Sequence, residues 1–283
     1  MAIRSATAQD TPLTPLEVQR LQQAHQALQT GRLHEARQLC QSVLTARPSQ
    51  ADTLHLLGLV LKAMGDRDGA LQAMQRSLSV RPHQPQLLNN LGNLLSDMGR
   101  IDEALAAYRQ ALTLEPRFLD AWINYGLTAL QASQLPEAIR ALRHATQINP
   151  KSPKAWMSLG SACRRSEQLD DAIACFRKSL ELAPGNARCW INLGSALRLN
   201  GEPDAALEAF DQAEKAGFTG PELLDGRASV LLDLGQTQEC IRLYRHIAGS
   251  APAYAAAHTT LAKLIWEQKL PEDPTASVRA ALA

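Results

Sequence analysis

The chain has 283 residues, of which 20% are charged, and a formal net charge of +1 at pH 7. A balance this close to zero excludes the strongly basic surface on which nucleic-acid-binding and membrane-surface proteins depend. Residues 1–14 lack the apolar core of a signal peptide, and no run of about 18 apolar residues predicts a membrane-spanning helix. We therefore expect a cytoplasmic protein with no nucleic-acid and no membrane partner.

The first predicted elements lie at the N-terminus. Residues 1–13 are polar, and we expect a disordered tail there. Thr14, Pro15 and Glu17 then have the spacing of a capping box with proline at the first helical position, which predicts the start of a helix. This helix is rich in glutamine, as is typical of the polar unit that closes one end of a repeat array.

A 34-residue period organises the chain from there on. Six of the 15 prolines share one phase of this period: Pro48, Pro82, Pro116, Pro150, Pro184 and Pro252. When the proline is counted as residue 32 of a unit, the units start at Glu17, Ala51, Pro85, Leu119, Pro153, Ala187, Pro221 and Ala255. A long period of this kind indicates supersecondary units that stack and share a core.

Each unit has the pattern of two short amphipathic helices. In the third unit Leu88, Leu91 and Leu95 are spaced for the buried face of the first helix, and Gly99 is placed to end it. Small residues such as Gly92 recur at the eighth place, where closely crossing helices leave no room for a larger side chain. We therefore expect an all-α solenoid of helix hairpins.

The residues at the fixed places resemble the tetratricopeptide repeat family. The fourth unit carries Trp122, Tyr125, Gly126, Ala138, Leu142, Ala145 and Pro150, and the fifth carries Trp156, Leu159, Gly160, Ala172, Phe176 and Pro184. The resemblance covers residues 14–283 and implies a right-handed superhelix of about seven to eight antiparallel helix pairs, the last of them truncated. It also implies that the first helices line a concave groove for an extended peptide or a partner helix, although a fold alone defines no function.

The residues that we expect in this groove come from six places of successive first helices. They are amides, small or apolar side chains and cations: Asn89, Asn90, Asn93, Ile123, Asn124, Leu127, Lys154, Met157, Ser158, Arg164, Arg165, Ile191, Asn192 and Arg198. A side-chain amide both donates and accepts, so a row of asparagines can bind a peptide backbone regardless of its sequence. The row is similar to that in the repeat arm of O-linked N-acetylglucosamine transferase. Alternatively, asparagine at the sixth place reflects only the consensus of the family.

The charge of the expected groove changes along its length. Its fifth and sixth units are basic and its seventh is acidic, the charged residues being Lys154, Arg164, Arg165, Arg188 and Arg198, then Glu222, Asp225 and Asp233. A partner with an acidic stretch beside an apolar one would complement this pattern, and ordinary solvated charges are the alternative. The carboxylate clamp of chaperone-binding relatives is not expected, because Asn89 and Ser158 stand where a clamp needs lysine and arginine.

The seventh unit departs from its siblings. Gly226 and Arg227 replace a polar residue and a leucine or tyrosine, and two glycines lie in the junction before it. An arginine at a core place needs an acidic partner, such as Asp225 or an acidic neighbour, or exposure through a bent stack. Degeneration of one repeat is the favoured interpretation, and a hinge or the edge of a site is the alternative.

The sequence contains no recognisable catalytic or metal-binding motif. The seven histidines are scattered, and neither a phosphate-binding glycine loop nor a Cys-x-x-Cys pair occurs. Cys40, Cys163 and Cys240 occupy core places, while Cys175 and Cys189 lie where they could approach each other across neighbouring units. Structural packing is the favoured role of all five cysteines, and metal or redox use is the alternative. We expect no enzyme activity, no cofactor and no metal.

These observations predict a non-catalytic scaffold that binds an extended segment of a partner protein. The alternative is the substrate-recruiting arm of a larger enzyme. Residues 273–283 stop inside the last predicted helix, and residues 264–277 are similar to the end of repeat arms joined to 2-oxoglutarate/iron oxygenases. Glycosyltransferases and sulfotransferases carry such arms too. The sequence specifies neither the partner nor the oligomeric state.

Overall fold

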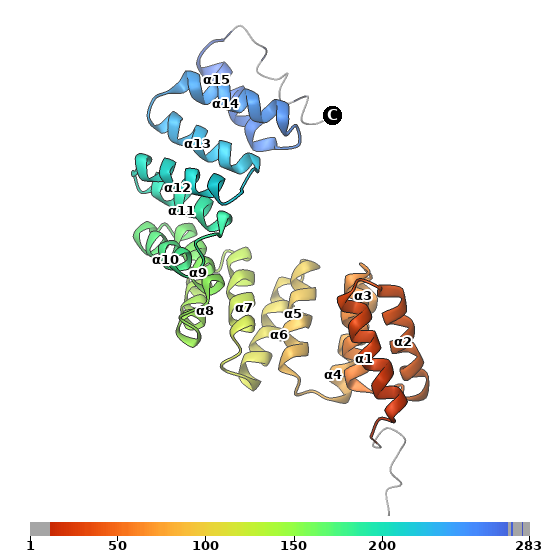
Figure 1. Ribbon diagram of the computed structural model, residues 1–283. Helices are drawn as coiled ribbons and strands as arrows, with labels where there is room; N and C mark the ends of the chain where they lie inside the picture. The colour runs from red at the N-terminus through yellow and green to blue at the C-terminus, as the bar shows by residue number, and fades with distance from the viewer. Residues whose placement is uncertain (1–11, 271–272, 274–278, 280–283) are drawn as a thin grey trace, which may run out of the picture. The chain divides into compact units, whose positions relative to one another are not determined.

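The computed structural model describes residues 12–270, 273 and 279 of the chain. Within these residues 15 α-helices follow one another and no strand occurs (Figure 1). The predicted all-α architecture of helix hairpins is thereby confirmed. Most of the predicted disordered tail and most of the last predicted helix lie outside the described residues.

The helices follow the 34-residue period of the sequence. The first helices of the pairs are α1 (Pro15–Gln29), α3 (Ala51–Ala63), α5 (Pro85–Asp97), α7 (Leu119–Gln131), α9 (Pro153–Arg165), α11 (Ala187–Leu199), α13 (Pro221–Asp233) and α15 (Ala255–Glu267). The second helices are α2 (Leu33–Ala46), α4 (Arg67–Val80), α6 (Ile101–Leu114), α8 (Leu135–Ile148), α10 (Leu169–Leu182), α12 (Pro203–Lys215) and α14 (Thr237–Ser250). From α3 onward every first helix begins at the residue where the period starts a unit.

The chain divides into two compact units, residues 1–141 and 142–283, with the boundary inside α8. We call these two compact parts the first unit and the second unit, whereas the third to seventh units are the 34-residue repeats of the sequence. The first unit holds α1 to α7, and the second unit holds α9 to α15. The predicted single groove would involve both units and therefore stays a prediction.

The capping box predicted at the start of α1 is present. The Glu17 amide donates to Thr14 Oγ1 at 3.3 Å, and the Thr14 amide donates to Glu17 Oε2 at 2.7 Å. Arg47, which follows α2, donates to Glu17 Oε1 at 2.8 Å. The bond from the Thr14 backbone, followed by that from Arg47, lowers the pKa of Glu17. Glu17 thus links the start of α1 to the residue that follows α2.

A left-handed backbone position follows each of the eight described first helices. Glycine occupies it in five pairs, with φ between 75° and 84°: Gly31, Gly65, Gly99, Gly201 and Gly235. Ser133, Glu167 and Lys269 adopt the same conformation at φ of 59°, 59° and 51°, at a cost of about 1–2 kcal/mol relative to glycine. The hairpin imposes this turn even where the sequence lacks the glycine that predicts it.

Three glycines at the eighth place, Gly92, Gly160 and Gly194, lie against an aromatic ring from the second helix of the same pair. A Cβ atom on Gly92 would lie 2.5 Å from Tyr108 Cε1, and one on Gly160 would lie 2.8 Å from the Phe176 ring. Carbon atoms in contact normally lie about 3.5–4.0 Å apart. In these two pairs the aromatic ring leaves no room for a side chain opposite it, which explains the glycine there.

A hydrogen bond joins the tryptophan at the fourth place of three units to the stop proline of the preceding unit. The indole Nε1 atoms donate to proline carbonyls at 2.9, 2.8 and 2.9 Å in the pairs Trp122–Pro116, Trp156–Pro150 and Trp190–Pro184. The bond attaches each first helix to the loop before it. It gives both residues a physical reason to keep their spacing of six.

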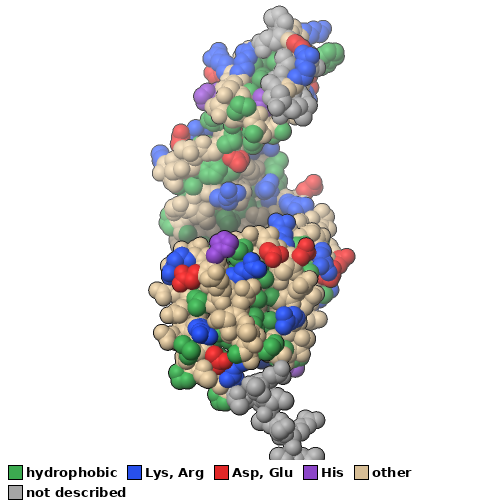
Figure 2. All heavy atoms as spheres, turned by 90° about the vertical axis from the view of Figure 1, so that its right-hand side faces the viewer, with side chains coloured by type: hydrophobic (Ala, Val, Ile, Leu, Met, Phe, Trp, Pro, Cys, Tyr) green, Lys and Arg blue, Asp and Glu red, His purple; other side chains and the backbone are tan. Residues whose placement is uncertain are grey.

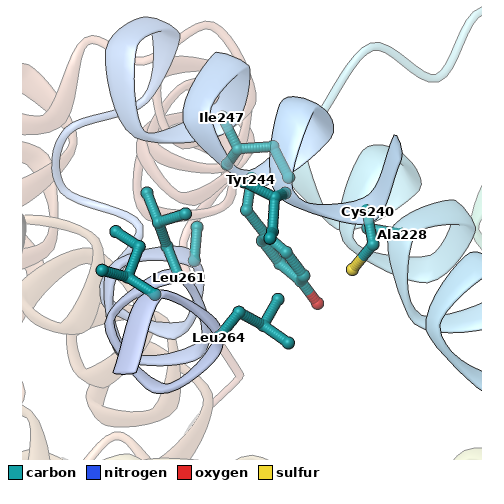
Figure 3. Packing of buried hydrophobic residues seen from close by; sticks show 9 residues of the cluster. Ala228, Cys240, Tyr244, Ile247, Leu261 and Leu264 are labelled. Carbon is teal, nitrogen blue, oxygen red and sulfur yellow. The ribbon is translucent and has the colours of Figure 1, made fainter. Parts of the chain in front are cut away.

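The last three described helices share one core in the second unit (Figure 3). It contains nine buried residues from α13, α14 and α15, among them Ala228, Tyr244 and Leu261. The Tyr244 ring extends from α14 into the space between α13 and α15. Cys240 belongs to this core, and all five cysteines are buried, which the repeat predicts for Cys40, Cys163 and Cys240.

Candidate partner-binding surfaces

A polar hollow of about 340 Å³ lies among the first helices of the first unit. Its lining comes from α3, α5 and α7, and from one tyrosine of α6: Lys62, Asn93, Ser96, Asp97, Tyr108, Asn124, Leu127, Thr128 and Gln131. Asn93, Asn124 and Leu127 are among the residues that the sequence predicts for a groove. The structure brings these three together on one surface.

The asparagines of this unit are tied to neighbouring side chains by one hydrogen bond each. Asn124 Nδ2 donates to Asn89 Oδ1 at 3.0 Å, and Asn93 Oδ1 accepts from the Tyr108 hydroxyl at 2.7 Å. An amide side chain has two donor hydrogens and two acceptor lone pairs. Asn93 and Asn124 therefore retain hydrogen-bonding capacity on the wall of the hollow while they also join α5 to its neighbours.

Asn90 makes a comparable link to the preceding first helix. Its Nδ2 atom lies 3.0 Å from Nε2 of His55 on α3. Burial lowers the pKa of His55, so the ring stays neutral and Nε2 can accept the amide hydrogen. The amide row thus connects α3, α5 and α7 in steps.

Some predicted groove residues are sealed from solvent. Ile123 is 0% exposed and Asn89 6%, and Ser158 in the second unit is 4% exposed. The prediction that Ile123 offers an apolar contact to a ligand is wrong, because its side chain belongs to the core of the first unit. Asn89 acts through its bond to Asn124, and Ser158 lies too deep to touch a ligand on the surface.

Tyr108 passes beneath α5 and reaches the hollow with its hydroxyl. The side chain is 1% exposed, and this burial raises the pKa of Tyr108 to about 12. In the unfolded chain a tyrosine loses its proton near pH ~10. Between these two values the unfolded chain binds fewer protons than the folded chain, so stability falls as the pH rises.

We expect Tyr108→Phe to weaken this alkaline destabilisation. Between pH 9 and pH 11 the variant should lose less stability than the wild type, by on the order of 1 kcal/mol, because one titrating group is gone. Urea unfolding at the two pH values measures the difference. An identical loss in both proteins would contradict the assigned shift, whatever the variant costs at neutral pH.

The first-helix face of the second unit is basic on α9 and α11. Lys154 and Arg165 are exposed there, and Arg164 and Arg198 are half-buried. Arg164 Nε is buried without a hydrogen-bond partner, and burial followed by the charge of Arg165 lowers the pKa of its guanidinium. A partly desolvated cation with an unused donor gains from an anionic ligand.

Polar and apolar side chains accompany these cations. Met157, Ile191 and Asn192 are half-buried on the same helices. Asn192 makes no hydrogen bond to another described residue, so its whole amide is available. The hydroxyls of Ser161 and Ser195 are used within their own helices, by bonds of 3.0 and 2.9 Å to backbone carbonyls.

Two of the predicted acidic groove residues of α13 are already bound inside the protein. Asp233 accepts from Arg198 at 2.8 Å. Asp225 accepts from the hydroxyls of Tyr244 and Tyr254 at 2.9 and 3.0 Å. Asp233 is therefore neutralised by an ion pair, and Asp225 is held by hydrogen bonds inside the protein.

The irregular residues of α13 have structural partners of their own. Arg227 pairs with Asp211 and Glu214 of α12 at 2.5 and 2.7 Å. The prediction of an acidic partner is confirmed, although the partner is not Asp225. A Cβ atom on Gly226 would lie 2.5 Å from Phe210 Cζ, which explains the loss of the sibling asparagine.

On the face in Figure 2, basic and acidic side chains are interspersed, and no large patch of one charge is seen. Among the described residues no group of three or more His, Cys, Asp or Glu side chains is placed to hold a metal ion. None of the described helices is long and apolar enough to cross a membrane.

Comparisons with known protein families agree with this geometry. The model of a family described as the cilia and flagella-associated protein 70 C-terminal domain matches residues 68–283, and a tetratricopeptide repeat model matches residues 50–81. The chain belongs to the tetratricopeptide repeat family. No curated protein gives a significant match.

Solved structures of tetratricopeptide proteins share the fold. MamA is 26% identical with a TM-score of 0.53, covering 56% of this chain and 94% of its own. A tetratricopeptide repeat protein from Parabacteroides merdae is 16% identical with a TM-score of 0.69, covering 88% and 98%. YrrB, described as having an unusual peptide-binding site, is 19% identical with a TM-score of 0.56, covering 66% and 97%. This fold is that of protein–protein interaction scaffolds, which are generally non-catalytic.

Proposed function

We propose that the chain binds extended segments of a partner protein on the first-helix faces of its units, without catalysis of its own. The hollow of the first unit carries the proposal. Its wall combines Asn93 and Asn124, whose amides have unused hydrogen-bond donors and acceptors, with Leu127, which is 37% exposed. Amides suit a peptide backbone, and an exposed leucine beside them suits an apolar side chain of the same peptide.

The basic face of the second unit supports the choice of an acidic partner segment. Lys154 and Arg188 make no ion pair with a described residue, and Arg164 Nε has no hydrogen-bond partner. Opposite charges across an interface raise the association rate and select the partner, and their effect falls with salt. Absence of enzyme activity and of a cofactor stays part of the proposal.

Selection of binding peptides tests the proposal. A displayed random-peptide library is selected on the full chain, and the enriched peptides are measured by fluorescence anisotropy. We expect Leu127→Arg to lower the affinity for peptides that bind the first unit by at least ~10-fold, because the new side chain fills the hollow. Arg164→Glu should weaken acidic peptides and reduce the salt dependence of their binding.

Each variant has a matched control elsewhere on the chain. Leu114 on α6 is 38% exposed and lies outside the hollow, so Leu114→Arg makes the same change at equal exposure. Arg177 on α10 is exposed and off the first-helix face, which makes Arg177→Glu the control for Arg164→Glu. Equal binding by variant and control would refute the assigned surface, and a library without enriched peptides would refute peptide binding.

A further inference from the structure

Two cysteines meet inside the hairpin of the fifth unit. Cys163 on α9 and Cys175 on α10 are 1% and 7% exposed, line one cavity, and lie close enough for each thiol to shift the pKa of the other. Cys189, predicted as a neighbour of Cys175, instead donates to the Phe176 carbonyl at 3.6 Å. The sequence contains this pair without any motif that marks it, because the two places meet only when the hairpin folds.

Both cysteines line a cavity of about 520 Å³ in the second unit. The cavity opens to solvent, because Asp171, Ala174 and Lys178 on its wall are exposed. A small solute that enters the cavity reaches the wall to which both cysteines belong, where 7% of Cys175 and 1% of Cys163 is exposed. This access distinguishes the pair from an ordinary core cysteine.

The sixth unit repeats this cavity without thiols. The residues 34 positions further on, Leu197 and Ala209, line a cavity of about 710 Å³. The repeat therefore brings the same two places together in both hairpins, and the thiols of the fifth unit stand where the sixth has a leucine and an alanine. That pair also shows which residues fill the two places in a natural hairpin of this chain.

The surroundings make the two thiols unequal. The hydrogen bond from Cys175 lowers the pKa of the Cys163 thiol, and Arg143 acts in the same direction, against burial and the charge of Asp171. The same bond, together with burial, raises the pKa of Cys175. Cys163 is thus the thiol that ionises first, and the thiolate is the reactive form of cysteine.

We propose that Cys163 and Cys175 are a redox modification site, at which a hydroperoxide converts the two thiols into a reversible intramolecular disulfide. A disulfide needs Cβ atoms about 3.5–4.5 Å apart. The two thiols lie on facing helices of one hairpin and line the same cavity, an arrangement from which this bond can form. The product ties α9, which carries Lys154 and Arg164, covalently to α10.

The chemistry balances in two steps. The Cys163 thiolate attacks one oxygen of hydrogen peroxide, the O–O bond breaks, hydroxide leaves, and Cys163 becomes a sulfenic acid. The sulfur of Cys175 then attacks the sulfenic sulfur, the S–O bond breaks, and the oxygen leaves as water with the Cys175 proton. The peroxide gains two electrons, and the two thiols lose them.

Thiol counting on the full chain tests the proposal. The reduced protein is treated with a small excess of hydrogen peroxide and denatured, and its free thiols are titrated. We expect the five thiols to fall by two, and a tryptic digest to contain one peptide pair linked through Cys163 and Cys175. Dithiothreitol should restore all five, and the oxidised protein should melt at a higher temperature.

Variants separate this pair from the remaining thiols. The double variant Cys163→Leu, Cys175→Ala has the pair of the sixth unit in place of the two thiols. Treatment with peroxide should change neither its number of free thiols nor its melting temperature. Cys175→Ala alone should stop at a sulfenic acid on Cys163 that dimedone traps. Cys189→Ala should still form the bond. Persistence of all thiols in the folded wild type, a link to another cysteine, or a link between chains would overturn the proposal.

Discussion

Phe210→Ala is expected to lower the free energy of unfolding of the second unit by about 3–5 kcal/mol. The ring is 0% exposed and touches the backbone of two first helices. A Cβ atom on Gly194 of α11 would lie 2.7 Å from it, and one on Gly226 of α13 would lie 2.5 Å from it. Truncation leaves a cavity that α11, α12 and α13 cannot close without moving their backbones. Urea unfolding followed by tryptophan fluorescence measures the loss.

A surface substitution in the same region calibrates this expectation. Leu199 at the end of α11 is 48% exposed, and Leu199→Ala should change stability by less than about 0.5 kcal/mol. Phe210→Leu should fall between the two, because it keeps part of the buried volume. Similar midpoints for Phe210→Ala and Leu199→Ala would show that the ring does not join the sixth and seventh units.

Asp225→Ala is expected to cost the second unit about 2–4 kcal/mol. The carboxylate on α13 accepts one hydroxyl from Tyr244 of α14 and another from Tyr254, which precedes α15. Burial raises the pKa of Tyr244 to about 12, so its hydroxyl keeps the proton that it donates. Removal of the acceptor leaves the Tyr244 hydroxyl, on a side chain 2% exposed, without a carboxylate. Chemical unfolding of purified protein measures the effect.

Two further variants at acidic positions of α13 identify the cause. Asp225→Asn keeps one carbonyl acceptor and should lose about half as much stability as the alanine variant. Asp233→Ala removes a pair whose carboxylate side chain is 48% exposed and should cost less than about 1 kcal/mol. If Asp225→Ala were no worse than Asp233→Ala, Asp225 would be an ordinary surface charge of a binding face.

Much of the fold could be predicted because its signals are local. The stop prolines and the eighth-place glycines recur every 34 residues, and the first helices from α3 onward begin where that period starts a unit. The capping box at Thr14 and the helix end at Gly99 follow from residues a few positions apart. The left-handed turn at Glu167 could not be predicted from its own residue, because the packing of the hairpin enforces it.

The candidate surfaces were predictable only in outline. Their amides and cations lie on first helices as expected, yet Ile123 and Ser158 are buried. Exposure at these places depends on how closely the next first helix approaches, which no local pattern encodes. The same limit applies to Arg227, whose acidic partners lie on α12 and not beside it on α13.

The sequence by itself determined the repeat, the starts of the first helices from α3 onward, the family and the class of protein, since each depends on periodicity and on contacts within a hairpin. Only the tertiary structure decided which polar groups remain available to a partner, which carboxylates are already bound, and that Cys163 and Cys175 meet. The physical reason is that hydrophobic periodicity specifies which face of a helix is buried. The identity of the side chain opposite depends on the distance and angle at which two helices cross.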